Sequence, residues 1–256
     1  MNEPRFTRLH ASLQQGFTLS PNIILKEAWQ RIHGAKLPII LATLGVLGVW
    51  LALNQLLVTV SGDEEELSWG VNLLGLVISM LMAPMTAALD MIGVHRAADK
   101  TVRPNQIFDY FPFIVPLAIA SMIMGLLSSV FVPLGLSLGL SPLVAMVPTL
   151  LVSVALMFTF PLILDKGFTP LQAITTSLRL FARQWVTLLS IHILLILVFV
   201  VAVLSFGVGL IWAIPLYIVT KGIIYRQACG IEGLDNHDAS QNEAAPTSTP
   251  KDHFDA

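Results

Sequence analysis

The sequence predicts an all-α, polytopic transmembrane bundle of six spans, arranged as three hairpins that are each preceded by a cytoplasmic interfacial helix. This prediction rests on three observations: the apolar composition, two long runs without charge, and a pattern that occurs three times. Hydrophobic residues make up 55% of the chain and charged residues only 12%, about half the charged fraction of soluble domains. The mean hydropathy of +0.78 is typical of a membrane protein.

The six spans are predicted from the distribution of charge along the chain. No Lys, Arg, Asp or Glu occurs from Tyr110 to Leu164, and His192 is the only basic or acidic residue from Gln184 to Thr220. Each run can hold two helices of about 20 residues, the length that crosses the hydrocarbon core. Helices are expected because an isolated span must satisfy its own backbone groups. The predicted spans are residues 37–60, 69–92, 111–132, 143–164, 185–206 and 210–225.

The positions of the basic residues predict the orientation. In a six-span chain all 14 Lys and Arg residues fall on one side of the membrane, and the first loop on the other side, "SGDEEELS", holds four acids. Because basic loops stay inside, both termini are predicted to be cytoplasmic. Residues 1–36 form a cytoplasmic N-terminal segment with an amphipathic helix, residues 37–228 the membrane domain, and residues 229–256 a disordered cytoplasmic tail of low apolar content.

The stretch "GFTPLQAITTSLRLFARQW", residues 167–185, predicts an interfacial helix over residues 170–183. Thr169 can cap it, Pro170 suits the first helical position, and Gln172 can complete a capping box. Its apolar side chains step by three and four residues and are expected to turn into the bundle or the acyl region. They are Leu171, Ile174, Leu178 and Phe181.

Related phrases precede the other two hairpins. In "GFTLSPNIILKEAWQRI", from residue 16, Ile24, Ala28 and Ile32 make the apolar face, and a shorter version is "TVRPNQIFDYF", residues 101–111. The second span of each hairpin also repeats a pattern: a proline, an ionisable residue within two turns, and then glycine. The proline and ionisable residue are Pro84 and Asp90, Pro161 and Asp165, and Pro215 and Lys221. Such hairpin repeats build transporters, and they also build plain bundles.

The stretch "FPLILDKGFTPLQAITTSLRLFARQWVTLL", residues 160–189, resembles the YciC-like family of bacterial inner-membrane proteins. It is also similar to the membrane domain fused to some glycerophosphodiester phosphodiesterases, whose catalytic module is absent here. The resemblance extends more loosely over residues 16–230. It implies a six-helix protein of the bacterial inner membrane concerned with the upkeep of the envelope, and it implies no catalytic residues.

Four intramembrane polar positions are candidates for a site: Asp90, Asp165, His192 and Lys221. Ionisable groups at membrane depth are functional hypotheses by default. The structural alternatives are a neutral His192 bonded to a neighbouring helix, an ion pair of Asp90 with nearby His95 or Arg96, and a Lys221 that snorkels to the interface. Met82 and Met85 share a face and could suggest a soft-metal site, but adaptable packing around Pro84 is favoured.

Three function classes follow. The first is a non-enzymatic protein that organises lipid or protein in the envelope, and the second is a small-solute or lipid permease built from three hairpins. The third, an enzyme on lipid head groups, would need Asp90, Asp165 and His192 to converge. A central cavity lined by Asn54, Asn72 or His192 would favour transport. No cofactor, metal or nucleic-acid partner is predicted; membrane lipids and other membrane proteins are the expected partners.

Overall fold

The computed structural model describes residues 7–17, 19–61 and 69–231, and within these ranges every regular element is a helix. Five helical stretches are long and apolar enough to cross a membrane, which confirms an all-α chain with the features of a multi-pass membrane protein. They are Lys36–Thr59, Val77–Ala97, Pro104–Ser137, Pro142–Lys166 and Pro170–Leu204. The predicted sixth span, α10 (Leu210–Cys229), is not among the five, and its second half carries Lys221 and Arg226.

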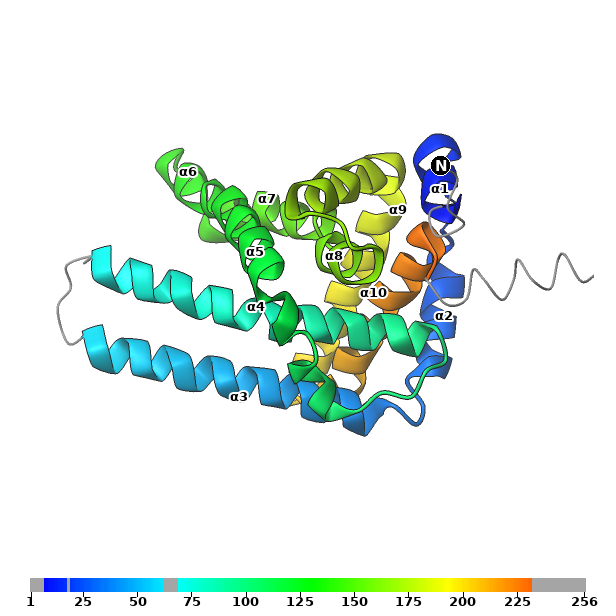
Figure 1. Cartoon of the computed structure of the whole chain (residues 1–256), viewed down its shortest axis with the longest axis horizontal. Helices are drawn as coiled ribbons and strands as arrows, with labels where there is room; N and C mark the ends of the chain where they lie inside the picture. The colour runs from blue at the N-terminus through cyan, green and yellow to red at the C-terminus, as the bar shows by residue number, and fades with distance from the viewer. Residues whose placement is uncertain (1–6, 18, 62–68, 232–256) are drawn as a thin grey trace, which may run out of the picture.

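The first pair of long helices is α3 (Lys36–Ser61) and α4 (Trp69–Ala97), which lie side by side and point away from the rest of the molecule (Figure 1). The outer face of α3 exposes large apolar side chains such as Leu41, Leu44 and Leu51. Exposed apolar faces of this size are stable against acyl chains and costly in water. The residues that join the two helices, 62–68, lie outside the described part of the chain.

The second group contains α5 (Ile114–Ser129), α6 (Phe131–Ser137), α7 (Pro142–Ala155) and α8 (Thr159–Lys166). The predicted fourth span is broken between α7 and α8. Ser177, in the helix that follows, satisfies two backbone groups at this break. Its hydroxyl donates to the Ala155 carbonyl at 2.7 Å and accepts from the Phe158 N–H at 3.3 Å. Irregular backbone at membrane depth is tolerated where protein groups satisfy it in this way.

The predicted amphipathic helix at residues 101–111 is wrong. The chain there forms only two short 3₁₀ turns, η2 (Pro104–Phe108) and η3 (Phe111–Phe113), and Ile107 is the buried residue of the first. A continuous helix from Pro104 into α5 would place Pro112 in its interior, where the missing N–H removes a backbone hydrogen bond. Of the three related stretches, only those that begin at residues 16 and 167 therefore contain an α-helix, α2 (Pro21–Arg31) and the start of α9 (Pro170–Leu204).

The third group is α9 (Pro170–Leu204) followed by α10. The predicted interfacial helix and the predicted fifth span are one helix with a kink at Gln184, whose φ of −137° and ψ of 31° are not helical. The start is as predicted, since the Gln172 side-chain oxygen accepts from the Thr169 N–H at 3.2 Å. The kink lets the two parts of α9 follow different directions without a loop.

The predicted apolar side chains of residues 170–183 divide between the bundle and the outer surface, and Phe181 is partly buried against the core. Ile174 is buried, but Leu171 is 64% and Leu178 is 39% exposed. The buried positions beside Ile174 are Ala173, Ser177 and Leu180. Small residues let α9 approach the α7–α8 break closely, so the larger leucines are left on the outer surface, where they can meet acyl chains.

The N-terminal segment packs as α1 (Thr7–Gln15) and α2 (Pro21–Arg31). Ile24, Ala28 and Ile32 are fully buried, so the predicted apolar face of this segment is confirmed. At the other end, α10 runs to Cys229 and Ile231 is buried in the core, so the predicted tail starts later than residue 229. The rest of that tail, residues 232–256, lies outside the described residues.

Helices α4 and α10 cross at two glycines, and this crossing is the centre of the fold. A Cβ atom built on Gly93 would lie 2.2 Å from the Ile218 carbonyl oxygen, and one on Gly222 would lie 2.1 Å from the Gly93 carbonyl oxygen. Only glycine permits such contact between backbones, as in the small-residue crossings of membrane helices. The crossing places Asp90, one turn before Gly93, beside Lys221.

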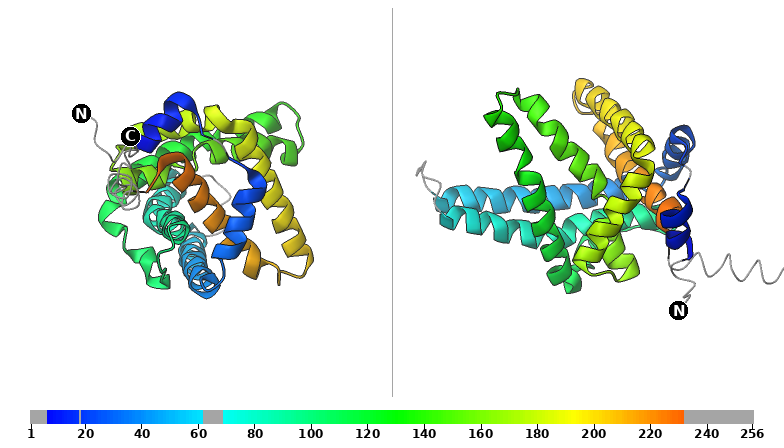
Figure 2. Two further views of the ribbon diagram at one scale, coloured as in Figure 1. Left: turned by 90° about the vertical axis from the view of Figure 1, so that its right-hand side faces the viewer. Right: turned by 90° about the horizontal axis from the view of Figure 1, so that it is seen from above.

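The three helix groups diverge from this crossing. In the right-hand view of Figure 2, α3 and α4 run at a wide angle to α9 and α10, and α5 and α7 lie between them. The charged residues in the described ranges lie on α1 and α2, in the segment that follows α4, or toward one end of the longer helices: the first part of α3 and α9 and the last part of α4, α8 and α10. The diverging parts are apolar.

Candidate functional site

An ion pair joins α4 to α10 beside the glycine crossing. Lys221 Nζ donates to Asp90 Oδ1 at 2.6 Å, and the two side chains are 16% and 15% exposed. The predicted pairing of Asp90 with His95 or Arg96 is wrong, because Arg96 donates to the backbone carbonyls of Arg31 and His33. The predicted snorkelling of Lys221 is also wrong, since its ammonium group is held inside the protein.

The ion pair lies in the wall of a cavity of about 420 Å³ between the helix groups. This cavity shares Thr43, Thr86 and Leu89 with a second one of about 560 Å³ that extends between α3 and α4. It shares Ser153, Tyr217 and Lys221, among others, with a third of about 140 Å³. The first two volumes lie in the range of ligand sites in proteins. The helix groups therefore leave adjoining, partly open spaces between them.

His192 lines the smallest of the three cavities. Its Nδ1 lies 2.8 Å from the Leu188 carbonyl oxygen of its own helix, not of a neighbouring one. A carbonyl oxygen can only accept, so the geometry assigns the proton to Nδ1. The ring also meets Tyr217 edge to face, with centroids 6.4 Å apart, and Lys221 Nζ lies 5.6 Å from the Tyr217 ring. Tyr217 thus stands between His192 and the ion pair.

Asp165 does not join this group. Its carboxylate accepts from the Tyr225 hydroxyl at 2.9 Å and lies 3.4 Å from Lys166 Nζ, with both members of the ion pair almost fully buried. It is not among the residues that line the three cavities. The structure brings together Asp90, Lys221 and His192 and keeps Asp165 in a separate contact between α8 and α10.

Sequence reasoning missed the partner of Asp90 and three aromatic residues of the site, Phe160, Phe199 and Tyr217. A signal for the ion pair was present: Asp90 and Lys221 occupy the same place in a repeated proline, ionisable residue, glycine pattern and have opposite charges. Opposite charges on two packed helices favour pairing in a medium of low dielectric. The aromatic residues had no such signal, because apolar side chains are common in every span.

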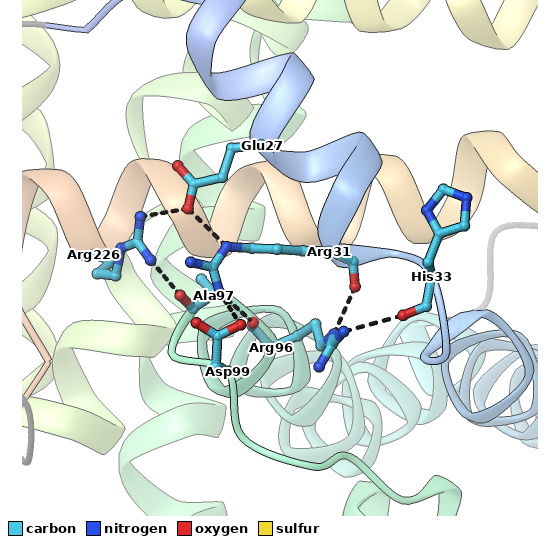
Figure 3. Close-up of polar contacts among 7 residues, drawn as sticks. All are labelled: Glu27, Arg31, His33, Arg96, Ala97, Asp99 and Arg226. Carbon is cyan, nitrogen blue, oxygen red and sulfur yellow. Dashed lines mark hydrogen bonds and ion pairs between the residues drawn. The ribbon is translucent and has the colours of Figure 1, made fainter.

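A second polar cluster holds the ends of the helices together, and we call it the polar clasp: Glu27, Arg31, Arg96, Asp99 and Arg226 (Figure 3). Glu27 Oε1 accepts from Arg31 Nε at 2.7 Å and from Arg226 Nη2 at 2.6 Å. Arg226 also donates to the Ala97 carbonyl, and Arg96 donates to the Arg31 carbonyl at 2.6 Å. The clasp ties α2 to the last turns of α4 and α10 and fixes the crossing that positions the ion pair.

Replacing Glu27 with glutamine is expected to loosen the clasp. A single carboxylate oxygen serves two guanidinium groups, so the neutral amide weakens two charge-assisted hydrogen bonds and leaves the two cations facing each other. The expected loss is about 1–3 kcal/mol of stability. Thermal unfolding in detergent would measure it, with Lys26→Gln, an exposed change on the same helix, as the matched control. Equal melting temperatures for the two variants would contradict the role of Glu27.

Asp99 gives the clasp a weak dependence on pH. A hydrogen bond from Arg31 holds the pKa of this carboxyl below its ordinary value. Because the folded-state pKa is depressed, the contribution of Asp99 to stability is present above its unfolded pKa of about 4 and is lost as the pH falls through the folded value. The Asp99 side chain is 72% exposed, so solvent screens the pair and the effect is small.

No group of three His, Cys, Asp or Glu side chains that could hold a metal ion occurs among the described residues. Met82 and Met85 are both buried in the core around Pro84, as packing residues are. Comparisons with protein-family models, with curated proteins and with solved structures returned no match for this chain. The functional argument therefore rests on the geometry of the cavities and the ion pair.

Proposed function

We propose that this chain is a non-catalytic, six-span protein of a bacterial inner membrane that binds a membrane lipid between its three hairpins. The observation that carries the proposal is the Asp90–Lys221 ion pair in the wall of the cavity of about 420 Å³. Charges are costly at membrane depth and usually serve a ligand or a pathway when they line a cavity. The proposal keeps the envelope role that the resemblance to YciC-like proteins implies.

The adjoining cavity of about 560 Å³ supports a lipid as the occupant. Its wall includes the large apolar side chains Leu47, Trp50 and Leu57, and both Leu47 and Trp50 are 46% exposed. In a bilayer such a groove is filled by acyl chains, which are as apolar as its walls. A polar head group beside the ion pair and chains in the apolar groove would use both spaces at once.

A filled-cavity variant tests lipid binding. Ser153 lines the two smaller cavities, so Ser153→Phe is expected to reduce the phospholipid retained by the purified protein several-fold. Native mass spectrometry of protein released from detergent micelles would count the bound lipids. Leu151→Phe, on an exposed position of the same helix, is the control and should retain the lipid of the unmodified chain. Equal retention by both variants would contradict the proposal.

A small-solute permease is the second candidate, and the polar lining of the larger cavity favours it. Asn54 and Ser79 lie in the wall of that cavity together with Thr43. The Asn54 amide donates to the Trp50 carbonyl of its own helix at 2.8 Å, which uses part of its capacity for a solute. Solute-uptake profiling of proteoliposomes would separate this candidate from lipid binding, because a lipid-binding protein would move no soluble compound.

The topology is predicted to be six spans with both termini in the cytoplasm. Reporter fusions after Asp99, in the basic segment, and after Gly230 should read inside, and a fusion after Leu138 should read outside. This result is expected because the charged residues of the described ranges gather where the helix groups meet, and basic segments stay in the cytoplasm. A periplasmic signal at Asp99 would contradict the orientation, and one at Gly230 alone would mean that α10 does not cross.

A further inference from the structure

The ion pair retains free hydrogen-bonding capacity toward the cavity. An ammonium group has three donors and a carboxylate has about four acceptor sites. Within the described ranges, the hydrogen bond found for Lys221 and for Asp90 is the one between them. Both residues line the cavity of about 420 Å³. The site therefore offers a cation and an anion side by side, with a net charge of zero.

Aromatic rings surround the same cavity. Phe160, Phe199 and Tyr217 all line it, and the rings of Phe199 and Tyr217 meet edge to face with centroids 5.9 Å apart. The faces of aromatic rings attract cations, above all in surroundings without water. Lys221 Nζ already lies over the Tyr217 ring at 5.6 Å. The carboxylate of Asp90 with the rings of Phe160 and Phe199 therefore makes a place for a ligand cation. Lys221, held beside Tyr217, suits a ligand anion.

Two threonines in the wall favour a ligand cation that can donate hydrogen bonds. Thr43 donates its hydroxyl proton to the Ile39 carbonyl at 2.9 Å, and Thr86 donates to the carbonyls of Ala83 and Met82 at 3.0 and 3.2 Å. Because these protons are used inside the helices, each hydroxyl oxygen has only lone pairs left to offer. Such acceptors match the N–H groups of a primary ammonium and not the methyl groups of a quaternary one.

We propose that the lipid is a zwitterionic phospholipid with a primary ammonium head group, with its phosphate at Lys221 and its ammonium at Asp90 and the aromatic rings. An anionic phospholipid such as phosphatidylglycerol would pair its phosphate with Lys221 but would bring no cation to the Asp90 carboxylate. This inference rests on the proposed function, because it names the head group of the lipid that the cavities hold.

Lipid competition on the full-length purified protein tests the head group. Phosphatidylethanolamine, phosphatidylcholine and phosphatidylglycerol with identical acyl chains would be offered in equal amounts, and the bound species counted by native mass spectrometry. Phosphatidylethanolamine is expected to be retained at least five-fold over each of the others. If phosphatidylglycerol were retained as well as phosphatidylethanolamine, the inference that the head group is zwitterionic would be overturned. If phosphatidylcholine were retained equally well, the inference that its cation is a primary ammonium would be overturned.

Variants separate recognition from a purely structural role of the ion pair. Asp90→Lys combined with Lys221→Asp keeps an ion pair between α4 and α10 but exchanges its charges relative to the rings, so the preference for phosphatidylethanolamine should be lost. Tyr217→Leu should weaken the preference several-fold, whereas Tyr217→Phe, which keeps the ring, should retain it. A preference that is unchanged in both the exchanged pair and Tyr217→Leu would overturn the proposal.

Two further results distinguish this inference from the proposed function. If the protein retains phospholipid without any preference among head groups, the head-group assignment fails and lipid binding stands. If it retains no phospholipid at all, both fail. Soluble glycerophosphoethanolamine should not displace the lipid at equal concentration, since it lacks the acyl chains for the larger cavity; displacement would overturn a lipid as the ligand.

Discussion

Replacing Gly93 with alanine is expected to destabilise the protein strongly, and Gly222→Ala should do the same. The added Cβ atoms would lie 2.2 and 2.1 Å from backbone oxygens, well inside any permitted contact. These oxygens belong to packed helices and cannot move away as a flexible side chain would. Overpacking of a core costs about 1–3 kcal/mol and occasionally more, and we expect the upper end because α4 and α10 must separate.

Separation of α4 and α10 has consequences at both polar clusters. The Asp90–Lys221 ion pair and the polar clasp both bridge these helices, so hydrogen bonds in both would lengthen together. Thermal unfolding in detergent, followed by the loss of the monodisperse peak in size exclusion, would measure the effect. Gly48→Ala is the matched control, because no atom lies within 4 Å of its added Cβ and alanine favours the helix. If Gly93→Ala were as stable as Gly48→Ala, the glycine crossing would be refuted.

Removing one member of the ion pair is expected to have the other large effect. Asp90→Ala leaves the Lys221 ammonium without its carboxylate, and Lys221→Ala leaves the carboxylate without its ammonium. Breaking a buried pair on one side costs about 3–5 kcal/mol, since an uncompensated charge stays in a medium of low dielectric. The cavity beside the pair can admit water, which lowers this cost toward 3 kcal/mol.

The double variant provides the decisive comparison. Asp90→Ala with Lys221→Ala removes both charges, so it should be more stable than either single variant, with a coupling energy of about 0.5–3 kcal/mol. Unfolding of the four proteins by increasing SDS in mixed micelles would give the cycle. Lys100→Ala, at an exposed position between α4 and η2, controls for the loss of a surface charge. Additive effects of the two single changes would mean that the pair contributes nothing to the fold.

The start of α9 illustrates how local sequence determines an element but not its packing. Thr169, Pro170 and Gln172 fix where this helix begins, because caps act through hydrogen bonds within one turn. Its buried face was not determined locally: Leu171 and Leu178 are exposed, and Ala173 and Ser177 are buried. In a membrane, helix contacts are enriched in small residues and polar groups rather than in large apolar ones. A stripe of large apolar side chains therefore does not identify the buried face of this helix.

The sequence by itself determined that the chain is helical and apolar and where its polar candidates fall. Apolar length and the absence of charge act within single segments, and the bilayer permits few alternatives to a helix. Only the tertiary structure decided that Asp90 pairs with Lys221 and that aromatic rings gather around the pair. The ion pair joins residues that are 131 positions apart in the sequence. It depends on the close backbone contact between α4 and α10, which forms only when Gly93 and Gly222 meet.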